Sequence, residues 1–161
     1  MRLYGYLILL LCMSGCLSVR AQTVSRFELA VAAIKRFEGF HGSSHHPYVG
    51  YGHRLRRGER LSWRMSEKEA DALLRKDLRG LCAIFRGFGR DSLLLATLAY
   101  NVGAARLLGH GSMPQSRLVA KLRKGDRDIY QEYVTFRRWK GKVIPSIELR
   151  RKVEFLLLYE P

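Results

Sequence analysis

The sequence is poor in cysteine, in acidic residues and in long apolar runs. Two of its three cysteines, Cys12 and Cys16, lie in an N-terminal stretch that we interpret as an export signal, so Cys82 would be the only one in the mature chain. A single thiol excludes an internal disulfide, and the leucines around Cys82 at helical spacing favour a buried packing role. The 161 residues show no repeat period and are enough for one domain with a core.

Acidic residues are outnumbered by basic ones, 14 against 29, which gives a formal net charge of +15. A field of this sign concentrates anionic polymers near the surface. Because the basic residues are spread along the chain without a nucleic-acid-binding motif, we expect no specific nucleic-acid partner. They do not gather on one amphipathic helix either, which disfavours a membrane-disrupting protein. For an exported protein, the nearest polyanions are those of the cell wall and outer envelope.

The N-terminus follows the pattern of an export signal. A basic residue, a short apolar run and small residues that end at Ala21 predict a cleaved signal peptide over residues 1–21 and a domain over residues 22–161. The run is short for a membrane span. The same stretch contains Met-Ser-Gly followed by Cys16, which resembles a lipoprotein cleavage site and would give a lipid anchor at Cys16. We expect export to the periplasm or cell surface, with soluble release favoured over lipid anchoring.

The remaining residues predict helices and one small β element. Ser25 and Glu28 can form a capping box at the start of a helix over residues 25–39. Five glycines and four histidines follow in residues 39–61, where the pattern of residues 48–53 favours a short hairpin. Later helices are predicted to begin near residues 66, 91, 116, 126 and 145, with Asp91 as the cap of the apolar run 93–100. The fold class is therefore α+β, predominantly α-helical, with strands only in this hairpin.

Glu38 extends the apolar stripe of the first predicted helix to its last turn. A carboxylate in such a place is unfavourable unless it has a partner or a purpose. Phe37, Phe40 and the negative end of the helix disfavour the ionised form, which suits an acid that protonates a leaving group. The structural alternative is an ion pair between Glu38 and Arg150 or Arg151.

Four segments resemble the motifs of phage-type lysozymes, a family of glycoside hydrolases. Residues 34–40 with residues 49–53 are similar to the family's helix-terminal Glu-Gly and its Ile-Gly-x-Gly-His strand. Three further matches follow in the family order, in residues 98–103, 116–126 and 142–154. Within the family, the compact Pro-Tyr-Val-Gly-Tyr-Gly-His form most resembles lysozyme-like proteins of Bacteroides-type conjugative transposons.

The resemblance implies a lysozyme-like fold and cleavage of the β-1,4 bond between N-acetylmuramic acid and N-acetylglucosamine in peptidoglycan. Glu38 would be the general acid. The residues that would bind substrate or support the site are Tyr48, Tyr51, His53, Asn101 and Arg151. We expect a bacteriolytic monomer that needs no cofactor, whose partners are peptidoglycan and a conjugation apparatus.

Two residues of the family pattern are missing. No acidic residue lies between Glu38 and His53, and Tyr48 stands where the family has threonine. His45 or His46 could activate the water as a neutral imidazole, and we take His46 as the catalytic candidate. Alternatively the muramyl 6-hydroxyl attacks internally, as in a lytic transglycosylase, or the site binds glycan without turnover.

Two other functions are alternatives to the enzyme. A non-catalytic peptidoglycan-binding or assembly protein of a conjugation apparatus would account for the missing acid and threonine. A zinc amidase would use the histidines of residues 41–53, but their spacing matches no standard metal motif, so we expect no metal. Trp63 and Trp139 suit either sugar stacking or the core, and the core is the commoner place for large aromatics.

Overall fold

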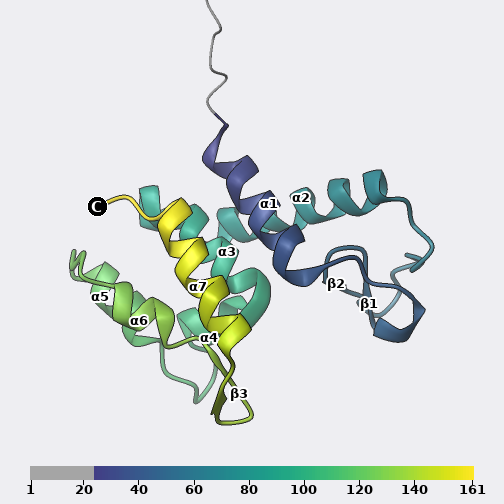
Figure 1. The fold of residues 1–161 in the computed structure, drawn as a ribbon. Helices are drawn as coiled ribbons and strands as arrows, with labels where there is room; N and C mark the ends of the chain where they lie inside the picture. The colour runs from purple at the N-terminus through teal and green to yellow at the C-terminus, as the bar shows by residue number, and fades with distance from the viewer. Residues whose placement is uncertain (1–23) are drawn as a thin grey trace, which may run out of the picture.

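The computed structural model describes residues 24–161, so the predicted signal peptide and Cys16 lie outside the described residues. The helices are α1 (Arg26–Glu38), α2 (Glu67–Ile84), α3 (Ser92–Val102), α4 (Ala104–Leu108), α5 (Arg117–Arg123), α6 (Tyr130–Val134) and α7 (Pro145–Leu158). The strands are β1 (Tyr48–Val49), β2 (His53–Arg54), β3 (Arg138–Trp139) and β4 (Lys142–Val143). No helix in this part of the chain is long and apolar enough to cross a membrane. The predicted α+β class, dominated by helices, is confirmed (Figure 1).

The first two long helices begin at the serines that the sequence indicates. Ser25 accepts a hydrogen bond from the Glu28 amide, but the Glu28 carboxylate binds Arg75 of α2 instead of closing the predicted capping box. At the start of α2, Ser66 and Glu69 form the complete reciprocal box. The Glu28–Arg75 pair therefore uses a capping residue to join α1 to α2.

Strands occur in two hairpins, one of them unexpected. β1 pairs with β2 in the predicted place, with Val49 opposite His53. β3 and β4 form a second antiparallel pair, so the expectation that strands end at the first hairpin was wrong. Lys140 at φ 47° forms part of the turn between these exposed two-residue strands, which have no apolar alternation to reveal them.

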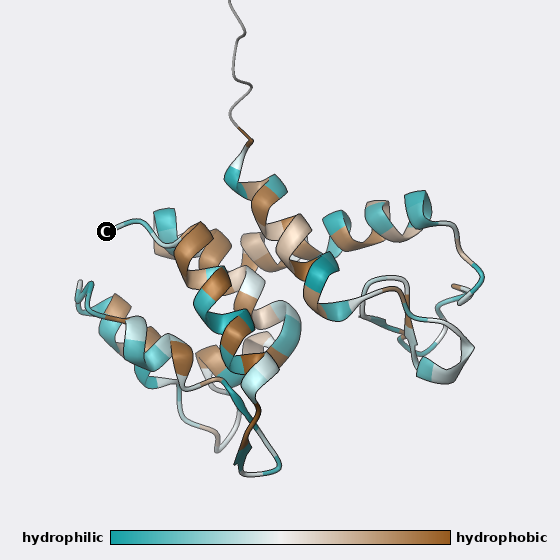
Figure 2. Ribbon diagram, in the orientation of Figure 1, coloured by the Kyte–Doolittle hydropathy of each residue, from teal (hydrophilic) through white to brown (hydrophobic). Residues whose placement is uncertain are grey.

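The core is built around α3, whose residues 94–99 are all buried. α3 packs against α2 and α7, and α1 packs against α7, so apolar turns gather where these helices meet (Figure 2). Cys82 is half-buried against this core, and burial raises the pKa of its thiol. Trp63 and Trp139 are 44% and 64% exposed, so the favoured core placement of both was wrong.

One face of α7 carries a buried cluster of charges. Glu154 accepts hydrogen bonds from Arg150 Nε at 2.7 Å and from Arg151 Nη2 at 3.1 Å. Its other oxygen accepts from the Tyr133 hydroxyl at 3.0 Å. Burial of charges without partners is strongly unfavourable, so these contacts are needed for α7 to pack against α3 and α6.

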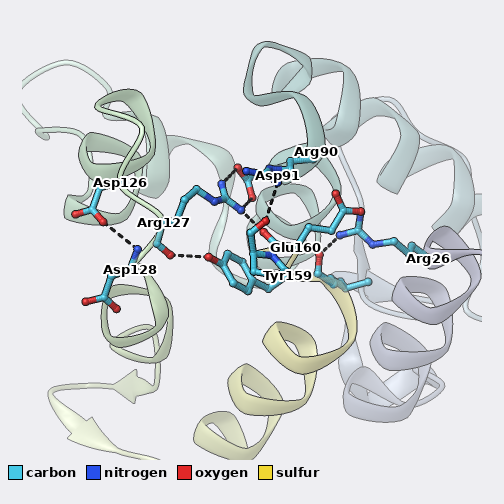
Figure 3. A network of polar contacts seen from close by, with 10 residues as sticks. Arg26, Arg90, Asp91, Asp126, Arg127, Asp128, Tyr159 and Glu160 are labelled. Atoms are coloured by element: carbon cyan, nitrogen blue, oxygen red, sulfur yellow. Dashed lines mark hydrogen bonds and ion pairs between the residues drawn. The ribbon is translucent and has the colours of Figure 1, made fainter.

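The C-terminal segment is tied to the rest of the fold by arginines (Figure 3). Arg26 at the start of α1 pairs with Glu160, and the Tyr159 hydroxyl donates to the Arg127 carbonyl at 2.6 Å. Arg127 also pairs with Asp91, which we expected to cap α3. That prediction was wrong, because the Asp91 side chain makes no cap hydrogen bond.

The α7 cluster gives a stability prediction. Glu154→Gln leaves two buried guanidiniums without their shared carboxylate and should lower the free energy of unfolding by about 3–5 kcal/mol in urea denaturation. Glu148→Gln is the matched control on the same helix, because Glu148 pairs with Arg137 and Lys152 at the surface, and its loss should stay below about 1 kcal/mol. Equal losses in the two variants would show that the cluster does not carry this stability.

Candidate active site

Glu38 is the last residue of α1, and its carboxylate lies where three helices converge. The side chain is 17% exposed, and Oε1 accepts a hydrogen bond from Arg150 Nη1 of α7 at 2.7 Å. Asn101 Nδ2 of α3 lies 3.5 Å from the same oxygen. The ion pair considered as the structural alternative is thus present, and it orients the carboxylate so that Oε1 is held by protein groups.

The second oxygen of Glu38 faces the first hairpin. A Cβ on Gly52 would lie 3.2 Å from Oε2 and 3.3 Å from the carboxyl carbon. Gly52 also has a φ of +91°, a backbone conformation that residues with a side chain rarely adopt. Glycine at this position therefore allows the hairpin to approach the carboxylate and leaves room beside Oε2.

The hairpin is fixed to α3 by a partly buried tyrosine. The Tyr100 hydroxyl donates to the Tyr51 carbonyl at 2.9 Å, and burial raises the pKa of Tyr100 well above its usual value. The Tyr51 ring meets Phe40 edge to face at 5.5 Å, and Lys35 lies over it at 4.9 Å. Tyr51 therefore supports the position of the loop that follows Glu38.

His53 joins the hairpin to α2 and to the loop before it. It is 6% exposed, with Nδ1 2.6 Å from Asp77 and Nε2 3.0 Å from Glu59. Burial alone would lower the pKa of His53, but the hydrogen bonds with Glu59 and Asp77 outweigh it and raise that pKa. With both ring nitrogens occupied, His53 is a structural clamp and gives the zinc alternative no support.

The other histidines lie in the loop between Glu38 and the hairpin. His45 Nδ1 accepts a hydrogen bond from the Gly42 amide at 3.1 Å, and the ring stacks on His41 at 4.7 Å. Since that lone pair is occupied, neutral His45 is poorly suited to be a base. Burial and the charge of His45 lower the pKa of His41. His46 is exposed and makes no side-chain hydrogen bond among the described residues, so its catalytic role stays a prediction.

The two neighbouring arginines of α7 have different partners. Arg151 is fully buried and reaches Glu154 and, at 3.4 Å, the Asn101 amide oxygen. Arg150, which was not among the site residues predicted from the sequence, is the one that touches Glu38. The motif contains both arginines, and only the rotation of α7 in the fold decides which of them faces α1.

A groove of about 980 Å³ runs along this site. Tyr48, Gly52 and His53 line it from the hairpin, and Asn101 lines it from α3. Its apolar surface includes Leu81 and Ile84 of α2 and Ala99, Tyr100 and Val102 of α3. Gly52 lies beside the Glu38 carboxylate, Asn101 lies 3.5 Å from Oε1, and both residues line the groove, so they connect the carboxylate to this space.

The helical fold, the small hairpin and the glutamate beside the groove define a lysozyme-like protein. The sequence profile of phage lysozymes matches residues 35–154, and the chain therefore belongs to the phage lysozyme family. It is similar to the muramidase domain of SpmX from Asticaccaulis excentricus, with 25% identity and a TM-score of 0.64 over 82% of this chain and 95% of that chain. The active form of the P1 phage endolysin Lyz has the same fold, with 18% identity and a TM-score of 0.63 over 81% of this chain and 83% of that one. No curated protein sequence matches the chain.

Gly52 gives a prediction that separates the site from the fold. Gly52→Ala should lower peptidoglycan cleavage, because the new methyl group occupies the space beside Glu38 Oε2. Gly58→Ala is the matched control, since Gly58 has a similar φ of +88° and nothing within 4 Å of the added Cβ. Both variants should lose about 1–2 kcal/mol of unfolding free energy from backbone strain, and only Gly52→Ala should lose activity. Equal activities would contradict this role for Gly52.

The clamp around His53 predicts a pH-dependent contribution to stability. A raised pKa in the folded state means that the protonated imidazole stabilises the fold below the unfolded-state value of about 6.5, and that the gain is lost as pH rises through the folded-state pKa. The difference in unfolding free energy between the wild type and His53→Gln should therefore be largest in acid and shrink towards alkaline pH. Urea denaturation of both proteins at a series of pH values measures this difference. A difference in unfolding free energy that did not change with pH would refute the clamp.

Proposed function

We propose that the chain is an exported glycosidase that cleaves the β-1,4 bond between N-acetylmuramic acid and N-acetylglucosamine in peptidoglycan. The observation that carries the proposal is the placement of Glu38, with Oε1 held by Arg150 and Oε2 beside Gly52 at the groove. Membership of the phage lysozyme family supports this substrate and this reaction class, as do the similar folds of a muramidase domain and a phage endolysin.

Glu38 acts as the general acid in this proposal. Protonated Glu38 gives its proton to the glycosidic oxygen as the bond from that oxygen to the muramyl C1 breaks, and the sugar ring becomes oxocarbenium-like. Arg150 and Asn101 fix the carboxyl group through Oε1, so that the less constrained oxygen is directed to the substrate. Fixed geometry of this kind lowers the entropic part of the barrier.

The nucleophile that completes the reaction has two candidates. In hydrolysis, water adds to C1 and its proton goes to a base, either Glu38 in its carboxylate form or His46. In lytic transglycosylation, the 6-hydroxyl of the same muramyl residue adds to C1 and gives its proton to Glu38, so no second base is needed. Positions 39–52 contain no acidic residue, so this segment supplies neither a second carboxylate nucleophile nor an acidic base.

The lack of an acidic residue at positions 39–52 also favours a second candidate function, that of a non-catalytic peptidoglycan-binding protein. The groove and its apolar surface would then hold glycan strands without cleaving them. From the sequence resemblance, we further propose that the protein acts at a conjugation apparatus after export. Mass spectrometry of the exported protein separates the two forms of export: an N-terminus at Gln22 means soluble release, and an acylated Cys16 means a lipid anchor.

The decisive variant is Glu38→Gln, assayed by mass analysis of the soluble muropeptides released from purified peptidoglycan. Loss of the acid should lower release by roughly 100-fold or more. Glu28→Gln is the matched control on the same helix, because it removes a carboxylate that pairs with Arg75 away from Glu38, and it should keep near wild-type activity.

The products identify the reaction. New reducing ends establish hydrolysis, and anhydro-muramyl ends establish transglycosylation. If the wild type binds the wall and releases nothing at any pH tested, the binding function replaces the enzymatic one.

A further inference from the structure

The groove beside Glu38 has a cationic rim that the glycosidase proposal does not use. Arg54 of β2, Arg56 of the following loop and Lys76 of α2 line the groove and are all exposed. None of these three side chains has an ion-pair partner in the part of the chain that the structure describes. We call these three residues the cationic rim.

The cationic rim differs from the half-buried cations of the fold because its side chains form no ion pair among residues 24–161. Arg26, Arg75, Lys121 and Arg127 each pair with at least one carboxylate, so their charge is compensated locally. The groove contains one acidic lining residue, Asp77, and its carboxylate is engaged by His53 at 2.6 Å. The groove therefore presents to a ligand three positive side chains that form no ion pair among residues 24–161, and the Glu59 carboxylate beside Arg56 is held by His53 and by the Arg56 amide.

Glycan and peptide place different demands on such a groove. Sugar rings offer apolar faces that suit the apolar lining residues Leu81, Ile84 and Val102, which we call the floor, and they carry no charge that the rim could recognise. In peptidoglycan, the muramyl residues also carry stem peptides, whose free carboxylates are anionic. Apolar floor and cationic rim together match a sugar strand that bears acidic peptides.

We propose that Arg54, Arg56 and Lys76 bind the stem-peptide carboxylates of peptidoglycan while the glycan strand lies in the groove. This inference rests on the proposed function for its substrate. It adds that the protein distinguishes strands with charged stem peptides from strands without them. Arg54 and Arg56 can bind a carboxylate through two parallel hydrogen bonds, whereas Lys76 supplies a point charge.

The test compares strand binding by two triple variants, both made in the Glu38→Gln background so that the polymer stays intact. One variant is Arg54→Gln, Arg56→Gln and Lys76→Gln. The matched control is Arg117→Gln, Lys124→Gln and Lys140→Gln. It removes three exposed cations that form no ion pair within residues 24–161 and that lie on and after α5 and in the turn between β3 and β4, far from the first hairpin (Figure 1). The ligands are soluble glycan strands with native stem peptides and the same strands after their carboxylates are converted to methylamides.

The Glu38→Gln protein and the control triple should bind native strands about tenfold more tightly than methylamide strands, given the modest energy of exposed ion pairs. The rim triple should bind both strands equally and at the weaker level. A rim triple that keeps the preference, or a control triple that loses it to the same extent, overturns the proposal. Loss of binding to phosphatidylglycerol vesicles without loss of strand binding also overturns it, because the rim would then face a membrane.

Two further measurements distinguish a failure of the rim proposal from a folding defect and from a failure of the proposed glycosidase function. Replacing Arg54 and Arg56 by lysine preserves their charge and should restore part of the preference, while a folding defect would not be repaired in this way. Cleavage of both native and methylamide strands by protein with native Glu38 reports the glycosidase separately from the binding preference. If that activity is absent while the binding preference persists, the proposed function fails and the assignment of the rim stands.

Discussion

The position of Arg150 is the constraint on which the rest of the site depends. Its side chain is 5% exposed and donates from Nε to Glu154 and from Nη1 to Glu38, each at 2.7 Å. A buried guanidinium with one partner removed is strongly unfavourable, so α7 and the end of α1 must stay in register. Burial tends to lower the pKa of Arg150, but Glu154 and Glu38 outweigh it and raise that pKa. With Arg151, the cluster holds two positive and two negative side chains and is close to neutral.

The hairpin completes the site from the opposite side of Glu38. Gly52 lies against Oε2, Tyr100 holds the Tyr51 carbonyl, and His53 connects the hairpin to α2. One oxygen of the carboxylate is therefore bound by helices and the other lies against the hairpin. This arrangement places Glu38 beside a groove whose floor is apolar and whose rim is positive, which is consistent with a charged and sugar-rich polymer as the ligand.

The sequence predicted the long helices and the first hairpin, because helix caps and apolar spacing are local signals. The family motifs also singled out Glu38, whose role in catalysis stays a prediction. It could not choose between Arg150 and Arg151, since that choice depends on the rotation of α7 against α1. The second hairpin was missed because its two-residue strands are exposed and basic. Asp91 was assigned to a cap because the competing partner, Arg127, lies far along the chain. The errors at Arg150 and Asp91 concern contacts between distant segments that no local pattern records.

In the proposed function, Glu38 faces the bond that is cleaved, and Arg150 holds the carboxyl group in place. A crystal structure of Glu38→Gln bound to a peptidoglycan glycan fragment tests it directly. We expect a glycosidic oxygen within hydrogen-bonding distance of the residue 38 side chain, at about 2.6–3.2 Å. We also expect sugar rings to occupy the groove lined by Tyr48 and Asn101. A fragment bound at another surface, or bound in the groove with no glycosidic oxygen near residue 38, would contradict this role for Glu38.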